Sequence, residues 1–213
     1  PDHLGGPANF YVEPKTNEIF IADGYRNRRV VVYDAATGKY LRHWGAYGKR
    51  PTDTEKYAYP VKLDAPPQEY STVHGIVGTK DGLLYVSDRR GNRIQVFRQN
   101  GEYLMEKFVR PETRGSGSGF SLQVSRDADQ SILYLMDGTN QRVWMLRRTD
   151  LEILDRFGKP GRQSGEFIRA HMIAIDSQNR MYTGEAGNGR RIQRWILKGT
   201  RPASSVKPPP SDQ

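Results

Sequence analysis

The chain has 213 residues, carries 33 Lys and Arg against 24 Asp and Glu, and contains no Cys. The length suits one domain with a hydrophobic core, or part of a larger one. Without Cys the chain forms no disulfide, thiolate metal site or Cys nucleophile, and no run approaches the roughly 20 apolar residues of a membrane-spanning helix.

The net charge of +9 allows nucleic acid, an anionic surface or an acidic ligand as partner. It also fits a solvated basic surface, because Arg and Lys are spread along the chain rather than gathered in one block. Charge alone therefore selects no function.

Four segments of the chain repeat one pattern: an apolar strand ending in an acidic residue, a polar turn rich in Gly and Asn, then an Arg and a second strand. The segments start at Ile19, Leu83, Ile132 and Arg180. Their acidic residues are Asp23, Asp88, Asp137 and Glu185. Successive acidic residues are 65, 49 and 48 positions apart, close to the ~40–50 residues of one propeller blade, with an insertion in the first interval.

A further strand is expected before and after each segment, which completes a four-stranded antiparallel unit. The repeats therefore predict an all-β fold, a β-propeller, over residues 1–198. Its four four-stranded blades are expected at about 6–44, 72–108, 119–157 and 168–197.

Two segments break the pattern. Residues 45–71 are rich in Pro and are expected to form a long loop at one rim, which could be deleted without loss of folding. Residues 199–213 are rich in Pro and Ser and too poor in apolar side chains to bury a core, so we expect a disordered tail.

The first strand of each blade lines the central channel of a propeller. Counting back 14 residues from the acidic residue gives Asn9, His74 and His171, and in the third blade, after correction for two extra hairpin residues, Ser121. In a six-bladed ring the two histidines would occupy two corners of a triangle, with the third corner in a blade before residue 8. Three His ligands with an open position are typical of catalytic zinc. The alternative is two unrelated channel histidines.

The repeated acidic residue and the Arg after it are expected to serve the architecture, because each blade must satisfy its turns and pack on its neighbour. Arg93 and Arg142 belong to this class. Arg89, which follows the acidic residue in the second blade only, does not.

The segments GPANFYVEPKTNEIFIADGYRNRRVVVYDAATGKYLRHWG and VHGIVGTKDGLLYVSDRRGNRIQVFRQNGEY resemble NHL-repeat propellers. Among these the chain is most similar, over about residues 3–197, to the peptidylglycine amidating lyases and related bacterial NHL proteins. The resemblance implies a six-bladed ring of which this chain supplies the last four blades. It also implies cleavage of an α-hydroxyglycine-extended peptide into an amide and glyoxylate, with zinc polarising the hydroxyl and a base removing its proton.

Position by position, the resemblance makes His74 and His171 two of three zinc ligands. Tyr25, in DGYRNRR, matches the catalytic tyrosine beside the zinc, and Arg89, in SDRRGNR, matches an arginine that contacts substrate. The chain departs from the family after its last His, where Met172 replaces a calcium-binding Asp, and at Arg169, where the family has a Met near the metal. Zinc is thus the expected cofactor, and calcium is left open.

Two functions remain. The first is a zinc-centred, lyase-like site acting on a small polar or carboxylated substrate, including a peptide-like one. The second is a non-catalytic scaffold that binds protein, or RNA, through a basic face, with loop residues Tyr25, Tyr47 and Tyr57 as stacking platforms. If the chain is such a scaffold, Tyr25 is only a turn residue and Arg89 is a solvated side chain. We expect a secreted or periplasmic location rather than a cytoplasmic one; the sequence as given carries no signal peptide.

Overall fold

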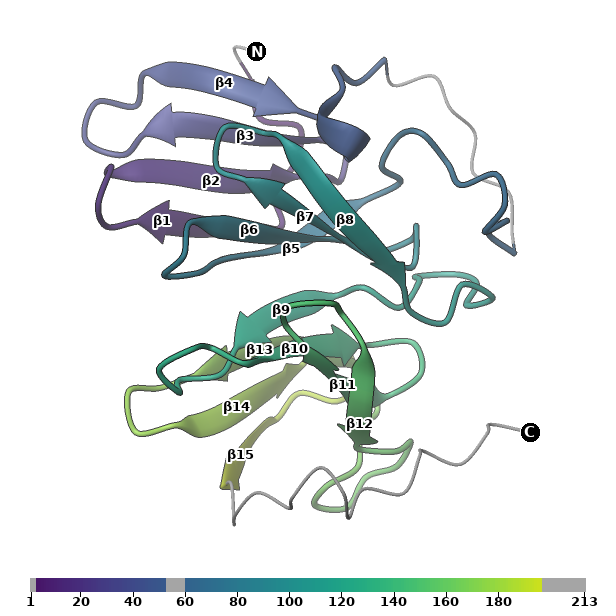
Figure 1. The fold of residues 1–213 in the computed structure, drawn as a ribbon. Coiled ribbons are helices and arrows are strands. Elements are labelled where there is room, and N and C mark those ends of the chain that lie inside the picture. Colours follow the sequence, from purple (N-terminus) through teal and green to yellow (C-terminus); the bar gives the residue numbers. More distant parts are fainter. Residues whose placement is uncertain (1–2, 53–59, 197–213) are drawn as a thin grey trace. The chain divides into compact units, whose positions relative to one another are not determined.

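The computed structural model describes residues 3–52 and 60–196. It is almost entirely β, with strands grouped into four sheets and one 3-10 helix, η1 (Ala46–Gly48) (Figure 1). Within each sheet, strands that follow one another in sequence are hydrogen-bonded neighbours. In the part of the chain that is described, no helix is long and apolar enough to span a bilayer.

The four sheets follow one another along the chain. The first contains β1 (Asn9–Glu13), β2 (Glu18–Asp23), β3 (Arg29–Asp34) and β4 (Tyr40–Trp44). The second contains β5 (Val73–Gly78), β6 (Leu83–Asp88), β7 (Arg93–Arg98) and β8 (Tyr103–Phe108). The third contains β9 (Ser121–Val124), β10 (Ile132–Asp137), β11 (Arg142–Arg147) and β12 (Ile153–Phe157). The fourth contains β13 (Ala170–Ile175), β14 (Arg180–Glu185) and β15 (Ile192–Ile196).

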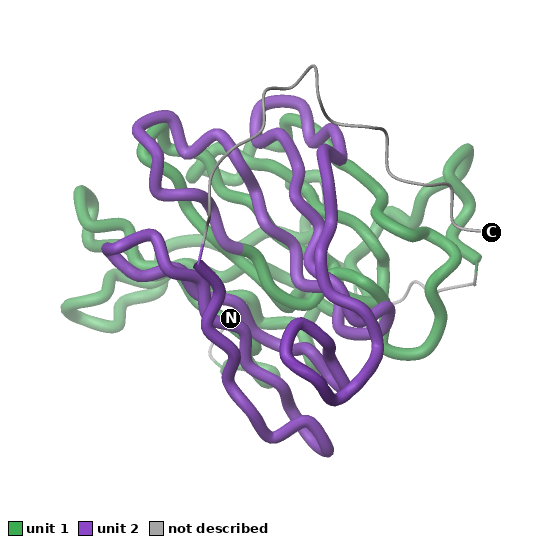
Figure 2. The backbone as a smooth tube through the Cα atoms, turned by 90° about the horizontal axis from the view of Figure 1, so that it is seen from below, with its two compact units in different colours: residues 1–122 green, residues 123–213 purple. Residues whose placement is uncertain are grey.

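This architecture confirms the predicted all-β propeller with four blades. The fourth blade shows three strands among the residues described, and the predicted tail at 199–213 lies outside them. The chain divides into two compact units, residues 1–122 and 123–213, so that the boundary falls inside β9 (Figure 2).

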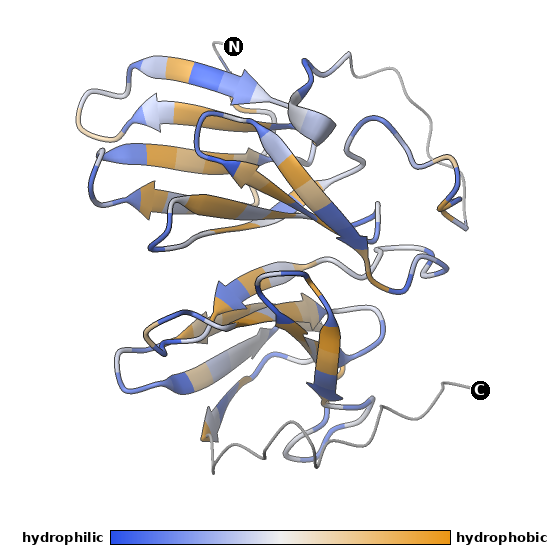
Figure 3. Cartoon of the chain, viewed as in Figure 1, coloured by the Kyte–Doolittle hydropathy of each residue, from blue (hydrophilic) through white to orange (hydrophobic). Residues whose placement is uncertain are grey.

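The core of the first unit lies between the first and second sheets. Phe20, Trp44, Leu84 and Phe97 pack there in one apolar cluster of buried side chains. Strands β5, β6 and β7 are buried along nearly their whole length, and Figure 3 shows their apolar stretches. Polar residues are buried with them, among them Arg93 and Gln95 in β7.

The long loop is part of this core, which contradicts its expected independence from the fold. Ala46, Val61 and Tyr70, all within residues 45–71, are buried. The fully buried guanidinium of Arg93 donates hydrogen bonds to the carbonyls of Pro67 and Glu69 in the same loop. Deletion of the described loop residues would thus remove core side chains and take two carbonyl acceptors from a buried cation.

In the first and second sheets, the acidic residue that ends the second strand holds the chain just before the first strand. Asp88 accepts hydrogen bonds from the backbone amides of Ser71 and Thr72 and from the Nε of Arg93, at 2.8–3.3 Å. Asp23 likewise binds the amide of Gly5 and the Nε of Arg29 in the first sheet. We call the end of each sheet where these carboxylates lie the anchor end, and the opposite end the far end.

The second unit repeats the arrangement with one variation. Glu185 accepts the amides of Ile168 and Arg169 and the Nε of Arg191. Asp137, the acidic residue of the third sheet, instead accepts the indole Nε1 of Trp144 at 2.9 Å. The expected architectural role of the repeated acidic residue and Arg93 therefore agrees with these contacts.

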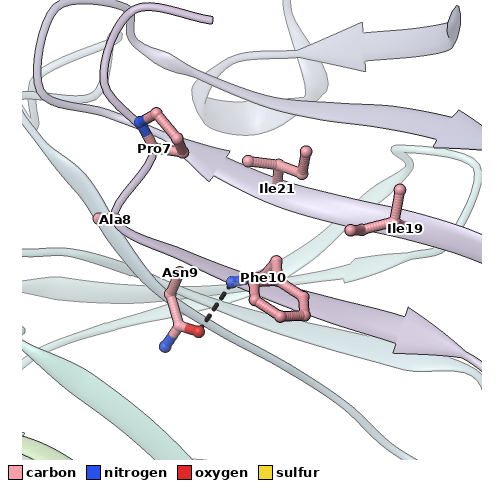
Figure 4. Close-up of a pocket in the computed structure, with 6 residues that line it drawn as sticks. All are labelled: Pro7, Ala8, Asn9, Phe10, Ile19 and Ile21. Atoms are coloured by element: carbon pink, nitrogen blue, oxygen red, sulfur yellow. Dashed lines mark hydrogen bonds between the residues drawn. The ribbon is translucent and has the colours of Figure 1, made fainter. Parts of the chain in front are cut away.

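The outer face of the first sheet is apolar and open. Pro7, Phe10, Ile19 and Ile21 line a shallow hollow of about 210 Å³ over β1 and β2 (Figure 4). The Phe10 side chain is 62% exposed, which is unusual for a large apolar residue in a strand.

Replacing Asp88 with Ala should lower the free energy of unfolding by about 3–5 kcal/mol, because it leaves the fully buried Arg93 without its closest carboxylate. Urea unfolding of the variant measures this loss. The control is Glu102→Ala, which breaks the exposed ion pair with Arg98 and should cost less than about 1 kcal/mol. Equal losses in the two variants would contradict the anchoring role of Asp88.

The contribution of Glu185 should depend on pH. Burial acts to raise the pKa of Glu185, but the amides of Ile168 and Arg169 and the Arg191 guanidinium hold that pKa below the ordinary value of 4.5. A carboxyl with a lowered folded-state pKa stabilises the fold above its unfolded-state pKa, and this contribution disappears as the pH falls through the folded-state value. Glu185→Gln should therefore cost about 2 kcal/mol at neutral pH and progressively less below pH 4.5 in urea titrations. A difference that stays constant with pH would exclude this mechanism.

Candidate metal and substrate site

Both predicted metal-binding histidines lie at a β-bulge in the first strand of their sheet. In β5, Val73 pairs with Asp88 and Gly75 pairs with Ser87, so His74 is the extra residue. In β13, Ala170 pairs with Glu185 and Met172 with Gly184, so the same holds for His171. Bulges re-aim a side chain and occur often beside active sites. The shared spacing that singled out the two histidines in sequence thus corresponds to a shared irregularity of the backbone.

Asn9 and Ser121 occupy the same sequence position in their own blades and differ from the histidines. Asn9 pairs regularly with Ala22 in β1 and β2, without a bulge. Ser121 is fully buried at the start of β9. The first-strand position therefore carries a bulged His in the second and fourth sheets and a small polar residue in the other two.

The ring of His74 is held in one orientation by two hydrogen bonds. Its Nδ1 lies 2.5 Å from the carbonyl oxygen of Phe120, and its Nε2 lies 3.0 Å from the hydroxyl of Tyr25. A carbonyl only accepts hydrogen bonds, so Nδ1 carries the proton and Nε2 presents a lone pair, which accepts the Tyr25 hydroxyl. A histidine that ligates a metal is typically fixed in this way, with the distal N–H on a backbone carbonyl. His74 therefore fits the role of a zinc ligand through Nε2.

Tyr25 reaches His74 because the turn after β2 approaches β5 closely. The amide of Tyr25 donates to the carbonyl of Gly6, and Gly24 lies so near the backbone of Val73 that a Cβ at residue 24 would overlap it. The Tyr25 ring meets the His74 ring edge to face, with 5.6 Å between centroids. Its side chain is 51% exposed, so the hydroxyl stands at the border between protein and solvent.

Arg89 lies beside this pair. Its guanidinium carbon is 5.4 Å from the centroid of the Tyr25 ring and 5.2 Å from that of Phe120, and its terminal nitrogen donates to the Tyr25 hydroxyl at 3.5 Å. Its backbone amide is fixed by the carbonyl of Thr72. Among the residues that the structure describes, its buried Nε has no hydrogen-bond partner. A cation held between two rings with an unused donor is suited to bind an anion.

The structure thus brings Tyr25, His74 and Arg89 together within the first unit. His171 belongs to the second unit, where it is half-buried beside the exposed Met172, and its sharing of one metal with His74 stays a prediction. Within residues 3–52 and 60–196, no three His, Asp or Glu side chains are grouped to hold a metal ion.

Phe120 was not expected at the site, yet it contributes both its carbonyl to His74 and its ring to Arg89. The available signal was its place directly before Ser121, the third blade's equivalent of His74. The chain folds back here because the Gly-rich segment 115–119 lies against Arg89; a Cβ at Gly117 would overlap the Arg89 backbone.

Known proteins resemble the chain in sequence over most of its length. No family model matches the chain. Over 194 residues it is 26% identical to peptidyl-glycine alpha-amidating monooxygenase B of Xenopus laevis, an alignment that covers 86% of this chain and 20% of that protein. The corresponding protein of Mus musculus is also 26% identical, over 193 residues, with 87% and 18% of the two chains covered. The chain resembles the peptidylglycine amidating enzymes. It spans about a fifth of their length.

Solved structures share the fold at lower identity. The WD40 repeats of RRP9 superpose with a TM-score of 0.62 and 16% identity, covering 92% of this chain and 50% of that one. A streptogramin B lyase superposes with a TM-score of 0.59 and 12% identity, covering 93% and 57%. At this identity the likeness shows the propeller fold alone.

Gly24→Ala should separate Tyr25 from His74, because the new Cβ overlaps the Val73 backbone that joins the two elements. We expect a loss of about 1–3 kcal/mol in unfolding free energy and a changed NMR signal of the His74 ring. Gly184→Ala is the control, since its Cβ would meet only the Cβ of Met172 at 3.9 Å. An unaltered His74 signal in Gly24→Ala would show that this close approach does not position the pair.

Proposed function

We propose that this chain forms part of a zinc-dependent, lyase-like propeller acting on a small polar or carboxylated substrate, including a peptide-like one. The observation that carries the proposal is the cluster of Tyr25, His74 and Arg89, which joins a histidine presenting a lone pair, an exposed hydroxyl and an anion-binding cation. The similarity to amidating enzymes supports the same reaction class.

In this proposal each residue has one task. His74 Nε2, together with His171 and a ligand from another blade, holds the zinc, which when bound polarises a substrate hydroxyl. Arg89 binds a carboxylate of the substrate through its terminal nitrogens, and the rings of Tyr25 and Phe120 keep its guanidinium in place. The Nε2 lone pair that accepts the Tyr25 hydroxyl in the metal-free chain would be taken up by zinc, so Tyr25 Oη would be released next to the metal. It is half open to solvent and within reach of Arg89, and is therefore placed to exchange a proton with the substrate hydroxyl.

We also propose that the intact ring has six blades, with another blade packed against the first sheet. The exposed Phe10 and Val12, and the hollow that Phe10 lines, support this, because such an apolar face is normally covered. A calcium ion is not part of the proposal, since the side chain of Met172 offers no oxygen ligand.

The scaffold alternative has less support. Of its three stacking residues, Tyr47 has its hydroxyl bound to Glu106 and its ring packed on Tyr103, and Tyr57 lies outside the described residues. Tyr25 is engaged with His74 and Arg89.

Metal analysis of the longest natural form of the protein tests the zinc site. We expect one zinc per chain, lost in His74→Ala and in His171→Ala, because each variant removes one of three ligands. His43→Ala is the matched control, since His43 lies on β4 and bonds to Tyr40 instead. Because ligation needs neutral imidazole, zinc occupancy should fall as the pH drops through about 6.5. A wild-type protein that remains metal-free after incubation with zinc would contradict the proposal.

Glyoxylate release from an α-hydroxyglycine-extended peptide tests the reaction. Tyr25→Phe, which keeps the ring under Arg89, should lower kcat by about 100-fold if Tyr25 moves a proton. Arg89→Met should mainly raise KM, because it removes the carboxylate contact. Activity unchanged in both variants would leave the scaffold function.

A further inference from the structure

The positive charge of the chain is concentrated at one end of its sheets. In the first unit, the described anchor-end connections contain nine Arg and Lys and only three Asp and Glu. These connections are residues 24–28, 45–52, 60–72, 89–92 and 109–120. The far-end connections contain three Lys and two acidic residues. They are residues 14–17, 35–39, 79–82 and 99–102.

The excess cations of the first unit are accessible. The exposed members at the anchor end are Arg26, Lys49, Arg50, Lys62, Arg90 and Arg114. They lie on the connections that follow β2, β4, β6 and β8, and Figure 1 shows η1 and the turn after β8 on the same side of this unit. The strand ends bring them together because alternate strands of an antiparallel sheet finish at the same end.

The second unit shows the same asymmetry. Its described anchor-end connections, residues 138–141, 158–169 and 186–191, contain five Arg and Lys and one Glu. Its far-end connections, residues 125–131, 148–152 and 176–179, contain two Arg and five acidic residues. The repetition in both units makes a chance distribution of surface charge a poor explanation.

We infer that the anchor end of the first unit docks an acidic segment of a peptide or protein. Clustered guanidinium groups match carboxylates in geometry, and a surface of one sign steers and concentrates an oppositely charged partner. In the first unit the surface is continuous with Tyr25 and Arg89, so an acidic segment bound there would lie beside the candidate site. The inference goes beyond the proposed function, because this docking requires neither a metal nor a reaction.

The aromatic residues at this end favour a peptide over single-stranded nucleic acid, which is bound through bases stacked on successive exposed rings. In the described anchor-end connections of the first unit, Tyr70 and Phe120 are buried and Tyr47 packs against Tyr103. Tyr25 is the one aromatic side chain there that is more than half exposed, and Arg89 already lies over its ring. The surface therefore offers positive charge but no series of exposed rings on which bases could stack.

The test compares two charge-reversal variants by fluorescence anisotropy. One is Arg26→Glu/Arg90→Glu/Arg114→Glu at the anchor end, and the other is Lys15→Glu/Lys39→Glu/Lys80→Glu at the far end. Both change the net charge equally, and all six side chains are exposed. The probes are labelled polyglutamate of about ten residues, a Gly-Ser peptide of the same length and an oligouridylate of the same charge, at salt below and at about 0.15 M.

We expect the wild type to bind polyglutamate and not the Gly-Ser peptide, with weaker binding at higher salt. The anchor-end variant should lose at least about 10-fold in affinity and the far-end variant less than about 3-fold. Equal losses in both would show attraction by net charge only and would overturn the inference. Tighter binding of the oligouridylate, lost in the anchor-end variant, would assign the surface to nucleic acid instead and would also overturn it.

Two further measurements separate this inference from the proposed function. The binding is repeated with a zinc chelator and with His74→Ala, both of which should leave the affinity for polyglutamate unchanged. Loss of activity with retained peptide binding therefore bears on the zinc site alone. Circular dichroism checks that the variants fold, and Arg26→Gln/Arg90→Gln/Arg114→Gln, which only removes charge, replaces the reversal variant if that one does not fold.

Discussion

A buried carboxylate at the end of the second strand holds three of the four sheets together. In the first, second and fourth sheets it accepts backbone amides from residues that lead into the first strand, and it binds an Arg at or just before the start of the third strand. A carboxylate with several charge-assisted hydrogen bonds is strongly held, and its removal leaves a buried cation and several amides unsatisfied. Asp88 links the largest number of segments, because its partner Arg93 also donates hydrogen bonds to two carbonyls of the long loop.

The same contact places the candidate site. Asp88 holds the amide of Thr72, two residues before His74, and Arg89 follows Asp88 directly in the chain. The carbonyl of Thr72 in turn accepts the amide of Arg89. The positions of His74 and Arg89 are thus both set by one architectural carboxylate, which explains how a structural repeat can also position a candidate site.

The third sheet shows what happens when the carboxylate takes its hydrogen bond from a neutral donor. Trp144 supplies an indole N–H to Asp137, and burial raises the pKa of this carboxyl above its ordinary value, although the charge of Arg142 acts to lower it. At Glu185, where Arg191 donates directly to the carboxylate, the pKa is held below its ordinary value. Equivalent carboxylates of the repeat therefore have pKa values shifted in opposite directions.

Much of this could be read from the sequence. The repeated acidic residue fixed the number and order of the blades, and the count back from it found His74, because both depend on local spacing within one sheet. The carbonyl of Phe120 and the burial of Tyr70 could not be read in this way. Both depend on segments that fold back over many residues without any periodic pattern. The bulge at His74 was also missed, since a single extra residue leaves no mark on an apolar strand.

The bulges have a consequence for how such a chain can change over time. A paired strand residue cannot be shifted without turning every following side chain to the other face. The extra residue of a bulge is exempt from this constraint, because it has no partner across the ladder. Residues 74 and 171 can therefore be inserted or deleted while the surrounding sheet keeps its register. A propeller built in this way can gain or lose a first-strand histidine one blade at a time.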